Sequence, residues 1–463
     1  MKALKPNNQG LSKILIITLL GFIVLVIAGV AFIALQPKPV SPKNVTLTMW
    51  GIWDETTDVA DIINSYHDAH PYITINYVKK RYEEFANALV TGWATDTGPD
   101  IYALPNTWLR DYSTDFITPV PATTKIAFYE NKKILFKSET KISYVARNSL
   151  TANDIKRDYI DVVYKDIILN GKIYGLPLGV NTLVMFYNKD LLNRAHLAQP
   201  PATWNDFVNA VGKITITNDR DEIIRAGAAL GTYDNIPNAS DLVTLLMLQN
   251  GAPMTTGGEV TFDQPTGSEQ NYYPAEQALR FYTDFASPEK SVYTWNDNVT
   301  TDAFDLFAQG NLGFLFGYRY QQSEITSRGL GADAFGLAPM PQINPDNEVN
   351  YADYWVYTVA RKSKYANESW AFLQYAADAK RSQPYDNKTK QTSVLRSVIS
   401  EQIEDPDMGM FAQQALTAQS WYRGKKPQKA EEYFGDMIKS VVARTSDIKQ
   451  AIILAAQKIQ QIY

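Results

Sequence analysis

The side chains of this sequence that could do chemistry are aromatic and polar residues that recur together after expected strands. Flat aromatic rings stack on the C–H faces of pyranose sugars, and carboxylate, amide and guanidinium groups bond to the hydroxyl rims. Loops after the carboxyl ends of strands in an α/β sheet face one crevice. The candidates are Trp53, Asp54, Asn106, Trp108, Asn181, Thr182, Tyr233, Asp234, Asn235, Tyr318, Arg319, Tyr320, Asp353, Tyr354 and Trp355, with Trp421 and Tyr433 as weaker ones.

Several of these candidates have a structural explanation as well as a binding one. Trp53 and Asp54 follow an expected strand and are as consistent with packing as with ligand contact. Asn181 could equally form a hydrogen bond within a hinge. Because side chains alternate across a strand, only one of Tyr354 and Trp355 can face the crevice while the other packs.

Familiar catalytic and metal motifs are missing from the sequence. It contains no GxSxG, GxxxxGK[ST] or HExxH pattern. His67 and His70 could share a helix face, but no third metal ligand accompanies them, and a solvated helix end explains them better. The aspartates of residues 297–305 lack the spacing and the glycine of an EF-hand. We therefore expect no catalysis, no metal site and no cofactor.

Length and composition favour a globular protein of two domains. The chain has 463 residues, 45% of them hydrophobic and 20% charged. The net charge of −5 argues against a nucleic-acid partner. The 28 Tyr, 19 Phe and 9 Trp residues exceed the needs of a core and leave aromatic rings for a sugar-binding crevice. The absence of cysteine excludes disulfides, thiolate metal sites, cysteine nucleophiles and a cysteine-linked lipid anchor.

An apolar segment near the N-terminus predicts attachment to a membrane. Ile14–Leu35 carries no charge and would span about 33 Å as a helix, enough to cross a bilayer core. Lysines before it favour a cytoplasmic N-terminus. A cleaved signal peptide is the alternative, although its apolar core is normally shorter. We predict that residues 1–13 are cytoplasmic, 14–35 form a single transmembrane signal anchor and 36–44 are a stiff, proline-marked linker.

The elements that must position the candidate residues have the order of an α/β fold. Val45–Met49 alternates like a strand, helical spacing follows up to Pro71, and Ile73–Tyr77 alternates again. Strand, helix and strand in this order indicate a βαβ unit. Gly171–Leu192 contains glycines, Leu176-Pro177-Leu178 and a short apolar run, which predicts a strand that crosses between two domains. A closing amphipathic helix begins at Ser446.

The crossing segment also resembles a known family. Gly171–Leu192 reads GKIYGLPLGVNTLVMFYNKDLL and is similar to the pattern GK.YG.P......YNK.LL of the extracellular solute-binding proteins of ABC transporters, family 1, the maltose-binding-protein-like, sugar-type group. The likeness extends from about Val45 to the C-terminus, and its strength lies in the order and spacing of short motifs. Further matching segments are Gly98–Ile101, Pro201–Phe207, Ala303–Gly317, Phe335–Pro341 (similar to the family's return crossing) and Lys364–Ala376. Within them we expect Thr203 to cap a helix, Leu312–Gly317 to form a strand, and Trp204 and Trp370 to be packing residues.

The resemblance implies a two-lobed periplasmic-binding-protein-like α/β fold of type II with hinge crossings. It implies a first lobe of residues 45–180 and 341–393, and a second lobe of residues 181–340 and 394–463. The expected function is that of an extracellular receptor of an ABC importer, which captures a mono- or oligosaccharide between the lobes and delivers it to the permease subunits. The anchor would hold this domain outside the cell membrane.

Two other functions stay open from the sequence. The same fold could bind a peptide, a polyamine or a phosphorylated polyol, and Arg319 reaching a carboxylate or phosphate would favour that. A surface carbohydrate-active enzyme is the third possibility. Residues 123–161 depart from the family pattern, and we expect an additional helical excursion there.

Overall fold

The computed structural model describes residues 21, 42–134, 137–266 and 272–463. The chain divides into two units, which we call the hairpin unit (residues 1–43 and 127–145) and the main unit (residues 44–126 and 146–463). Apart from Gly21, the expected anchor at 14–35 lies outside the described residues. Of the helices in those described ranges, none is both long and apolar enough to cross a membrane.

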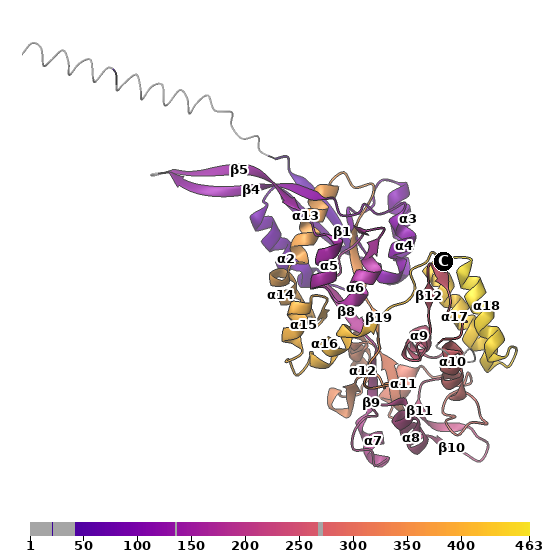
Figure 1. Cartoon of the computed structure of the whole chain (residues 1–463). Helices are drawn as coiled ribbons and strands as arrows, with labels where there is room; N and C mark the ends of the chain where they lie inside the picture. The colour runs from indigo at the N-terminus through magenta and orange to yellow at the C-terminus, as the bar shows by residue number, and fades with distance from the viewer. Residues whose placement is uncertain (1–20, 22–41, 135–136, 267–271) are drawn as a thin grey trace, which may run out of the picture. The chain divides into compact units, whose positions relative to one another are not determined.

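A four-stranded sheet forms the centre of what we call the first lobe of the main unit (Figure 1). Its order is β17-β3-β1-β2, comprising Trp355–Val359, Ile101–Pro105, Val45–Gly51 and Ile73–Lys79. β1 pairs in parallel with β2 and β3, and β17 runs antiparallel to β3. The alternation in β1 buries Val45, Leu47 and Met49, as the sequence pattern predicted. The parallel β1 and β3 therefore bring their carboxyl ends to one edge of the sheet.

Helices surround this first sheet. α2 starts with a capping box formed by Glu55 and Asp58, and it packs on β2, α13 and α14. Trp370 of α13 is buried, in agreement with its predicted packing role. The helices and short elements of this lobe are α2 (Thr56–Ala69), α3 (Tyr82–Ala94), η1 (Asn106–Trp108), α4 (Leu109–Ser113), α5 (Ala152–Asp158), α6 (Asp161–Ile167), β6 (Ile168–Leu169), β7 (Lys172–Ile173), α13 (Ala366–Ala376) and α14 (Ala379–Thr389).

The second lobe is built on a five-stranded sheet. Its order is β10-β11-β14-β9-β15, comprising Ile216–Thr217, Ile223–Ala228, Leu312–Gly317, Val184–Asn188 and Phe335–Ala338. β9 lies antiparallel between β14 and β15. The segment Phe335–Pro341, expected to be the return crossing, therefore begins with an edge strand of this sheet. The chain changes sheets further on, at residues 350–355.

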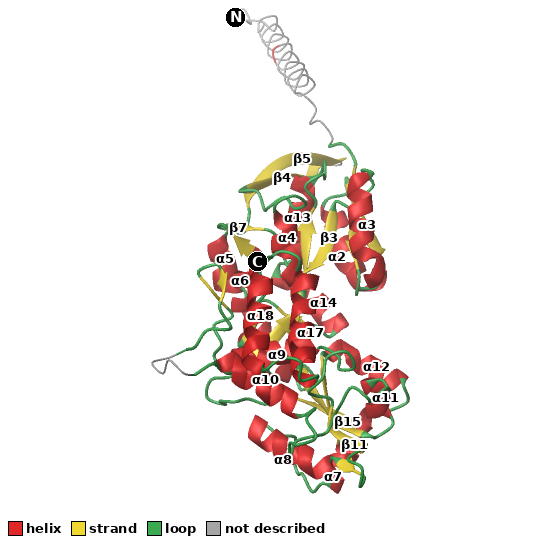
Figure 2. Ribbon diagram, turned by 90° about the vertical axis from the view of Figure 1, so that its right-hand side faces the viewer, coloured by secondary structure: helices red, strands yellow, loops and turns green. Residues whose placement is uncertain are grey.

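The helices of the second lobe follow their sequence signals closely. Thr203 caps α8 by accepting a hydrogen bond from the backbone N–H of Asp206, and α17 and α18 lie side by side (Figure 2). The closing helix starts at Ile448 rather than at Ser446, with Asp447 as its N-cap. The elements are α7 (Lys189–Arg194), α8 (Trp204–Ile214), α9 (Ala239–Gln249), β12 (Thr255–Thr256), β13 (Glu259–Val260), α10 (Pro274–Asp284), α11 (Ala303–Ala308), η2 (Arg319–Gln321), α12 (Gln322–Ser327), η3 (Ala332–Ala334), α17 (Pro427–Val442) and α18 (Ile448–Gln460).

A third sheet, which we call the connecting sheet, consists of the segments that pass between the lobes. Its order is β18-β8-β16-β19, comprising Thr392–Ser393, Gly179–Thr182, Asn350–Asp353 and Ala418–Gln419. β8 leads into β9 of the second lobe, and β16 leads into β17 of the first. The helices α15 (Arg396–Gln402) and α16 (Gly409–Leu416) pack against this sheet.

The segment expected to be a helical excursion is instead a β-hairpin. β4 (Thr123–Ile134) and β5 (Lys137–Asn148) pair as a two-stranded sheet, and a helix, α5, follows only at Ala152. The helical expectation was wrong: the segment is polar and mixed, so its sequence lacks the clear hydrophobic alternation that identifies a strand.

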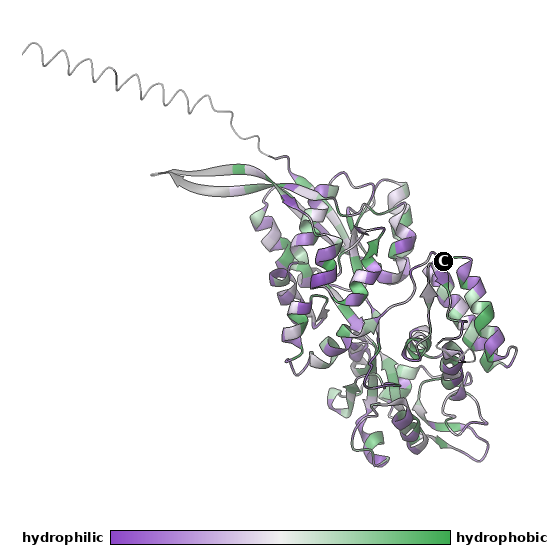
Figure 3. Cartoon of the chain, in the orientation of Figure 1, coloured by the Kyte–Doolittle hydropathy of each residue, from purple (hydrophilic) through white to green (hydrophobic). Residues whose placement is uncertain are grey.

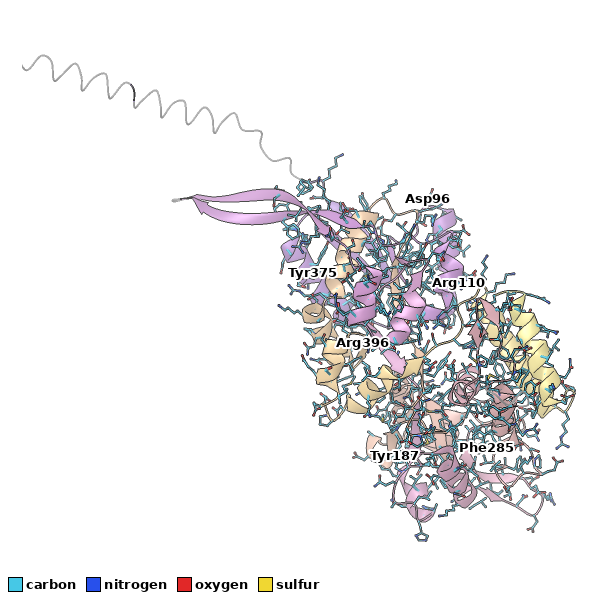
Figure 4. All side chains as sticks on the ribbon, viewed as in Figure 1. Asp96, Arg110, Tyr187, Phe285, Tyr375 and Arg396 are labelled. Carbon is cyan, nitrogen blue, oxygen red and sulfur yellow. The ribbon has the colours of Figure 1, made fainter. Side chains whose placement is uncertain are left out.

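The helices of the main unit combine polar and apolar residues, as helices that cover a sheet do (Figure 3). In the second lobe, Phe207 of α8 packs on Phe285, Phe314 and Phe316. Figure 4 shows Phe285 and Tyr187 in this lobe and Asp96 and Tyr375 in the first. Trp204, expected to be a packing residue, is buried against Phe207.

Candidate ligand cleft between the lobes

Two adjoining cavities lie between the two lobes of the main unit. The small chamber has a volume of about 350 Å³ and is lined from η1, α9, β16 and α17. The large chamber has a volume of about 860 Å³ and is lined from the β1–α2 loop, β8, α12 and α14. Both volumes are in the range of small-molecule sites. Four residues line both chambers: Trp53, Tyr320, Asp353 and Trp355.

An aromatic cluster separates the two chambers. Its members are Trp53, Tyr82, Tyr320 and Trp355, which come from both lobes. Ring centroids lie 5.8 Å apart for Trp53 and Tyr82, 5.8 Å for Trp53 and Tyr320, and 5.9 Å for Trp53 and Trp355. Trp53 is 51% exposed and Tyr320 is 47% exposed, although aromatic rings are usually buried. The cluster therefore presents ring faces and edges to both chambers.

The ends of secondary-structure elements place these rings. Trp53 lies in the short loop between β1 and the N-cap of α2, and Tyr82 is the first residue of α3. Tyr320 follows β14, and Trp355 is the first residue of β17. Of Tyr354 and Trp355, Trp355 is the one that lines the chambers, while the Tyr354 hydroxyl donates a hydrogen bond to Asp166 away from them.

Asp54 is a buried anchor at the wall of the large chamber. Its carboxylate accepts hydrogen bonds from the hydroxyls of Tyr357 (2.8 Å) and Tyr385 (2.7 Å), and its backbone carbonyl accepts one from Tyr77. Burial raises the pKa of the Asp54 carboxyl, and the two tyrosine hydrogen bonds oppose this rise. These bonds join the loop that carries Trp53 to β17 and α14.

Asp166 holds the wall behind the small chamber in place. The carboxylate accepts hydrogen bonds from Asn106 Nδ2 (2.9 Å), the Tyr354 hydroxyl (2.7 Å) and the Ser420 hydroxyl (2.7 Å). It also forms an ion pair with Arg423, whose Nη2 lies 2.7 Å from Oδ1. Asn106 and Trp108, both candidates, line the small chamber. Asp166 itself was not a candidate, because its partners are far away in the sequence.

Three carboxylates line the small chamber: Asp241 of α9, Asp353 of β16 and Glu431 of α17. Burial and the nearby Asp353 raise the pKa of Asp241 to about 8, and the Tyr318 hydroxyl donates a 2.7 Å hydrogen bond to it. Burial, with repulsion from Glu431, raises the pKa of Asp353 to about 6. Desolvation also raises the pKa of Glu431.

The large chamber has the basic side chains. Arg319, Lys388 and Lys390 line it together with Asn181. The guanidinium of Arg319 donates a hydrogen bond to the carbonyl of Asp407 (3.0 Å) and lies over the ring of Phe411. Burial lowers the pKa of Arg319. Much of its hydrogen-bonding capacity is therefore directed at the protein itself.

Some candidates lie away from both chambers. Tyr233 packs on Gly435 and Lys439, and Asp234 pairs with Lys439 at 3.4 Å. Asn235 bonds to backbone carbonyls of its own lobe. Thr182 is buried and accepts a hydrogen bond from Gln414, and Tyr433 lies beside Lys429 and Lys458. The other two candidates, Tyr318 and Trp421, line the small chamber.

The lining residues that sequence reasoning missed include Tyr82, Asp241, Tyr351 and Glu431. A signal existed for Asp241, which is the only charged residue of the apolar helix Ala239–Gln249. A single charged residue on a buried helix must be hydrogen-bonded or paired, or must face a ligand, so such a residue can indicate a binding site.

The sequence profile of the bacterial extracellular solute-binding proteins matches residues 61–409, most of the chain. The chain belongs to this family. A relative of this bacterial extracellular solute-binding protein is the galactooligosaccharide-binding protein of Bacillus subtilis (strain 168). The two are 21% identical over 424 residues, which is 90% of this chain and 89% of the relative.

Solved structures share the fold of this solute-binding protein. The sugar-binding protein MalE of Xanthomonas citri superposes with a TM-score of 0.67 at 18% identity, covering 90% of this chain and 96% of the other. The maltose-binding periplasmic protein MalE of Listeria monocytogenes, solved with maltose, gives a TM-score of 0.66 at 17% identity and covers 91% and 99%. The two-lobed α/β fold expected from the sequence is thereby confirmed.

Proposed function

We propose that this solute-binding protein captures a carbohydrate between its lobes and delivers it to the permease of an ABC importer. The observation that carries the proposal is the aromatic cluster of Trp53, Tyr82, Tyr320 and Trp355 at the junction of the two chambers. Stacking rings beside carboxylate and amide groups suit a sugar, which has apolar faces and a polar rim. The galactooligosaccharide- and maltose-binding relatives support this ligand class.

The ligand set that we propose follows from the lining of the chambers. It comprises the candidates Trp53, Asp54, Asn106, Trp108, Asn181, Tyr318, Arg319, Tyr320, Asp353 and Trp355, joined by Tyr82 and Asp241. Tyr233, Asp234 and Tyr354 lie outside the lining and are left out of this set. The protein would bind and release the sugar unchanged, with hinge motion at the connecting sheet opening and closing the cleft.

We also propose that residues 14–35 anchor the protein in the cell membrane as a single span, with the binding domain outside. The uncharged segment has the length for this, and the chain has no cysteine for a lipid anchor. The lobe boundaries that we propose are those expected from the sequence, 45–180 with 341–393 and 181–340 with 394–463, except that the return crossing lies at residues 350–355 rather than at 341. Membrane-fractionation of cells that express the full chain tests the anchor, because a cleaved protein would appear in the soluble fraction.

A saccharide screen tests the carbohydrate function. The purified full-length chain is mixed with mono- and oligosaccharides, and its melting temperature and binding heat are measured. Stabilisation by at least one saccharide, weakened by Trp53→Ala, is the expected result. If no member of a broad panel stabilises the protein while a peptide or a phosphorylated polyol does, the carbohydrate assignment is wrong.

A further inference from the structure

The charged side chains of the small chamber are all of one sign. Its lining contains three carboxylates, from Asp241, Asp353 and Glu431. Among the described residues that line it, there is no lysine, arginine or histidine. Hydroxyl and amide groups of the lining can serve the hydroxyls of a neutral sugar, but no lining residue offsets the charge of Asp353 and Glu431.

Among the described residues that line the small chamber, none places a positive charge beside these carboxylates. Neither Asp353 nor Glu431 forms an ion pair or a side-chain hydrogen bond with any residue that the structure describes. Asp241 receives hydrogen bonds from the hydroxyls of Tyr318 and Tyr351, which supply dipoles but no opposite charge. Negative charges held in a partly desolvated site without a cation are costly, and the raised pKa values of all three groups reflect this cost.

Asn106 adds an independent, unsatisfied acceptor to the same chamber. Its side chain is only 5% exposed, and its amide oxygen Oδ1 has no hydrogen-bond partner within the described residues. The amide orientation is fixed on the other side, because the carboxylate of Asp166 can only accept and therefore takes the Nδ2 donor. Buried polar atoms are almost always hydrogen-bonded. We therefore expect a ligand to donate a hydrogen bond to Asn106 Oδ1.

Aromatic rings complete the environment. Trp53, Tyr82, Trp108 and Tyr320 all line the small chamber. Ring faces attract organic cations, and they also suit the apolar face of a sugar. Acceptors and rings together therefore match a ligand that carries both a sugar ring and a positive charge.

The spacing of the acids favours an organic cation over a metal ion. Within the described residues no three acidic or imidazole side chains converge closely enough to hold a metal. An ammonium group has three donors that point in different directions, and its charge interacts with carboxylates that surround it at a distance. Separated carboxylates can therefore serve an amine although they could not form a metal shell.

We propose that the small chamber binds the protonated amine of an aminated saccharide, with Asp353, Glu431 and Asn106 Oδ1 as its acceptors. This inference rests on the proposed carbohydrate function and narrows it to cationic sugars. The amine occupies the small chamber, the adjoining sugar ring stacks on the aromatic cluster, and further rings extend into the large chamber.

Calorimetry with matched saccharides tests the inference. The full-length chain is titrated at neutral pH with glucosamine oligomers, with the same oligomers N-acetylated, and with maltooligosaccharides of equal length. We expect the glucosamine oligomers to bind at least about tenfold more tightly than their acetylated forms, because acetylation removes the charge but keeps the ring. The variants Asp353→Asn and Glu431→Gln should each reduce this preference at least about threefold and have a melting temperature no lower than that of the wild type.

The control and the contrary outcomes separate this inference from the proposed function. Glu432→Gln removes an exposed carboxylate beside Glu431 that pairs with Lys429, and it should leave the preference unchanged. If neutral saccharides bind and the amine gives no advantage, the amine subsite is wrong while the carbohydrate function stands. If spermidine binds and no saccharide does, both the aminated-saccharide class and the carbohydrate function are overturned.

Discussion

The indole ring of Trp53 lies stacked on the phenol ring of Tyr320, with ring centroids 5.8 Å apart and planes inclined by 25°. Trp53 comes from the β1–α2 loop of the first lobe, and Tyr320 from η2 of the second. The stack therefore connects the lobes directly at the boundary of the two chambers. Because hinge motion changes the distance between the lobes, opening of the cleft would separate these two rings.

Removing the Trp53 ring should weaken saccharide binding and leave folding intact. For Trp53→Ala we expect a loss of about tenfold in affinity, since an aromatic stacking partner is worth on the order of 1 kcal/mol. Because the Trp53 side chain is 51% exposed, the melting temperature should change little. Titration calorimetry measures the affinity, and Tyr272→Ala, an exposed tyrosine outside both chambers, is the control. Equal losses in the two variants would contradict a role for Trp53 in binding.

The carboxylates of the small chamber should make the ligand-free protein less stable as the pH rises. The folded-state pKa is about 8 for Asp241 and about 6 for Asp353, above the value of 3.8 expected in the unfolded chain. Their contribution to stability is fully present below the unfolded pKa and is lost as the pH rises through the folded values. Tyr318, Tyr320, Tyr351 and Glu431 face the same chamber and carry no compensating positive charge.

Neutralising Asp353 should therefore stabilise the free protein at high pH only. We expect Asp353→Asn to raise the melting temperature by about 2 °C at about pH 8, with little difference at about pH 4. Thermal-shift scans across this pH range, without ligand, measure the effect. An equal effect of the substitution at both pH values would show that Asp353 does not titrate in the folded protein as we describe.

The buried ion pair of Asp166 and Arg423 should contribute much more to stability than an exposed pair. Arg423→Met would leave the Asp166 carboxylate buried without its cation, which should cost about 3 kcal/mol. Arg396→Met breaks the exposed pair with Asp161 and should cost less than about 1 kcal/mol. Chemical denaturation of both variants gives the two free energies of unfolding. Similar small losses would mean that Ser420, Tyr354 and Asn106 satisfy Asp166 by themselves.

Features with a local signature in the sequence were predicted well. Leu312–Gly317 is a strand with the expected bounds, and Thr203 caps α8 as its position before Trp204 indicated. The strand Gly179–Thr182 lies in the connecting sheet, at the crossing expected within Gly171–Leu192. Each of these depends on residues that are adjacent in the chain, so one sequence is enough to show them.

Features made by distant residues could not be predicted. Asp166 lies in an ordinary amphipathic helix, and its partners Asn106, Tyr354 and Arg423 come from three other parts of the chain. The acidic character of the small chamber arises in the same way, from α9, β16 and α17. A single sequence shows which residues are polar, but it does not show which polar residues meet.

Close backbone contact explains the Gly98-Pro99-Asp100 motif and gives a final test. A Cβ atom added to Gly92, in α3, would lie 2.9 Å from the Cα of Gly98, and one added to Gly98 would lie 3.2 Å from the backbone carbon of Gly92. Gly98 also donates its N–H to the carbonyl of Gly92 at the end of the helix. Because backbone atoms cannot move aside as a flexible side chain can, Gly92→Ala should destabilise the protein by about 1–3 kcal/mol.

Gly212→Ala in α8 is the matched control, since nothing lies within 4 Å of its added Cβ. Alanine there should be neutral or stabilising by about 0.5 kcal/mol, as is usual for a glycine within a helix. Denaturant unfolding of both variants measures the difference, and an unchanged midpoint for Gly92→Ala would show that α3 can shift away from the Gly98 loop.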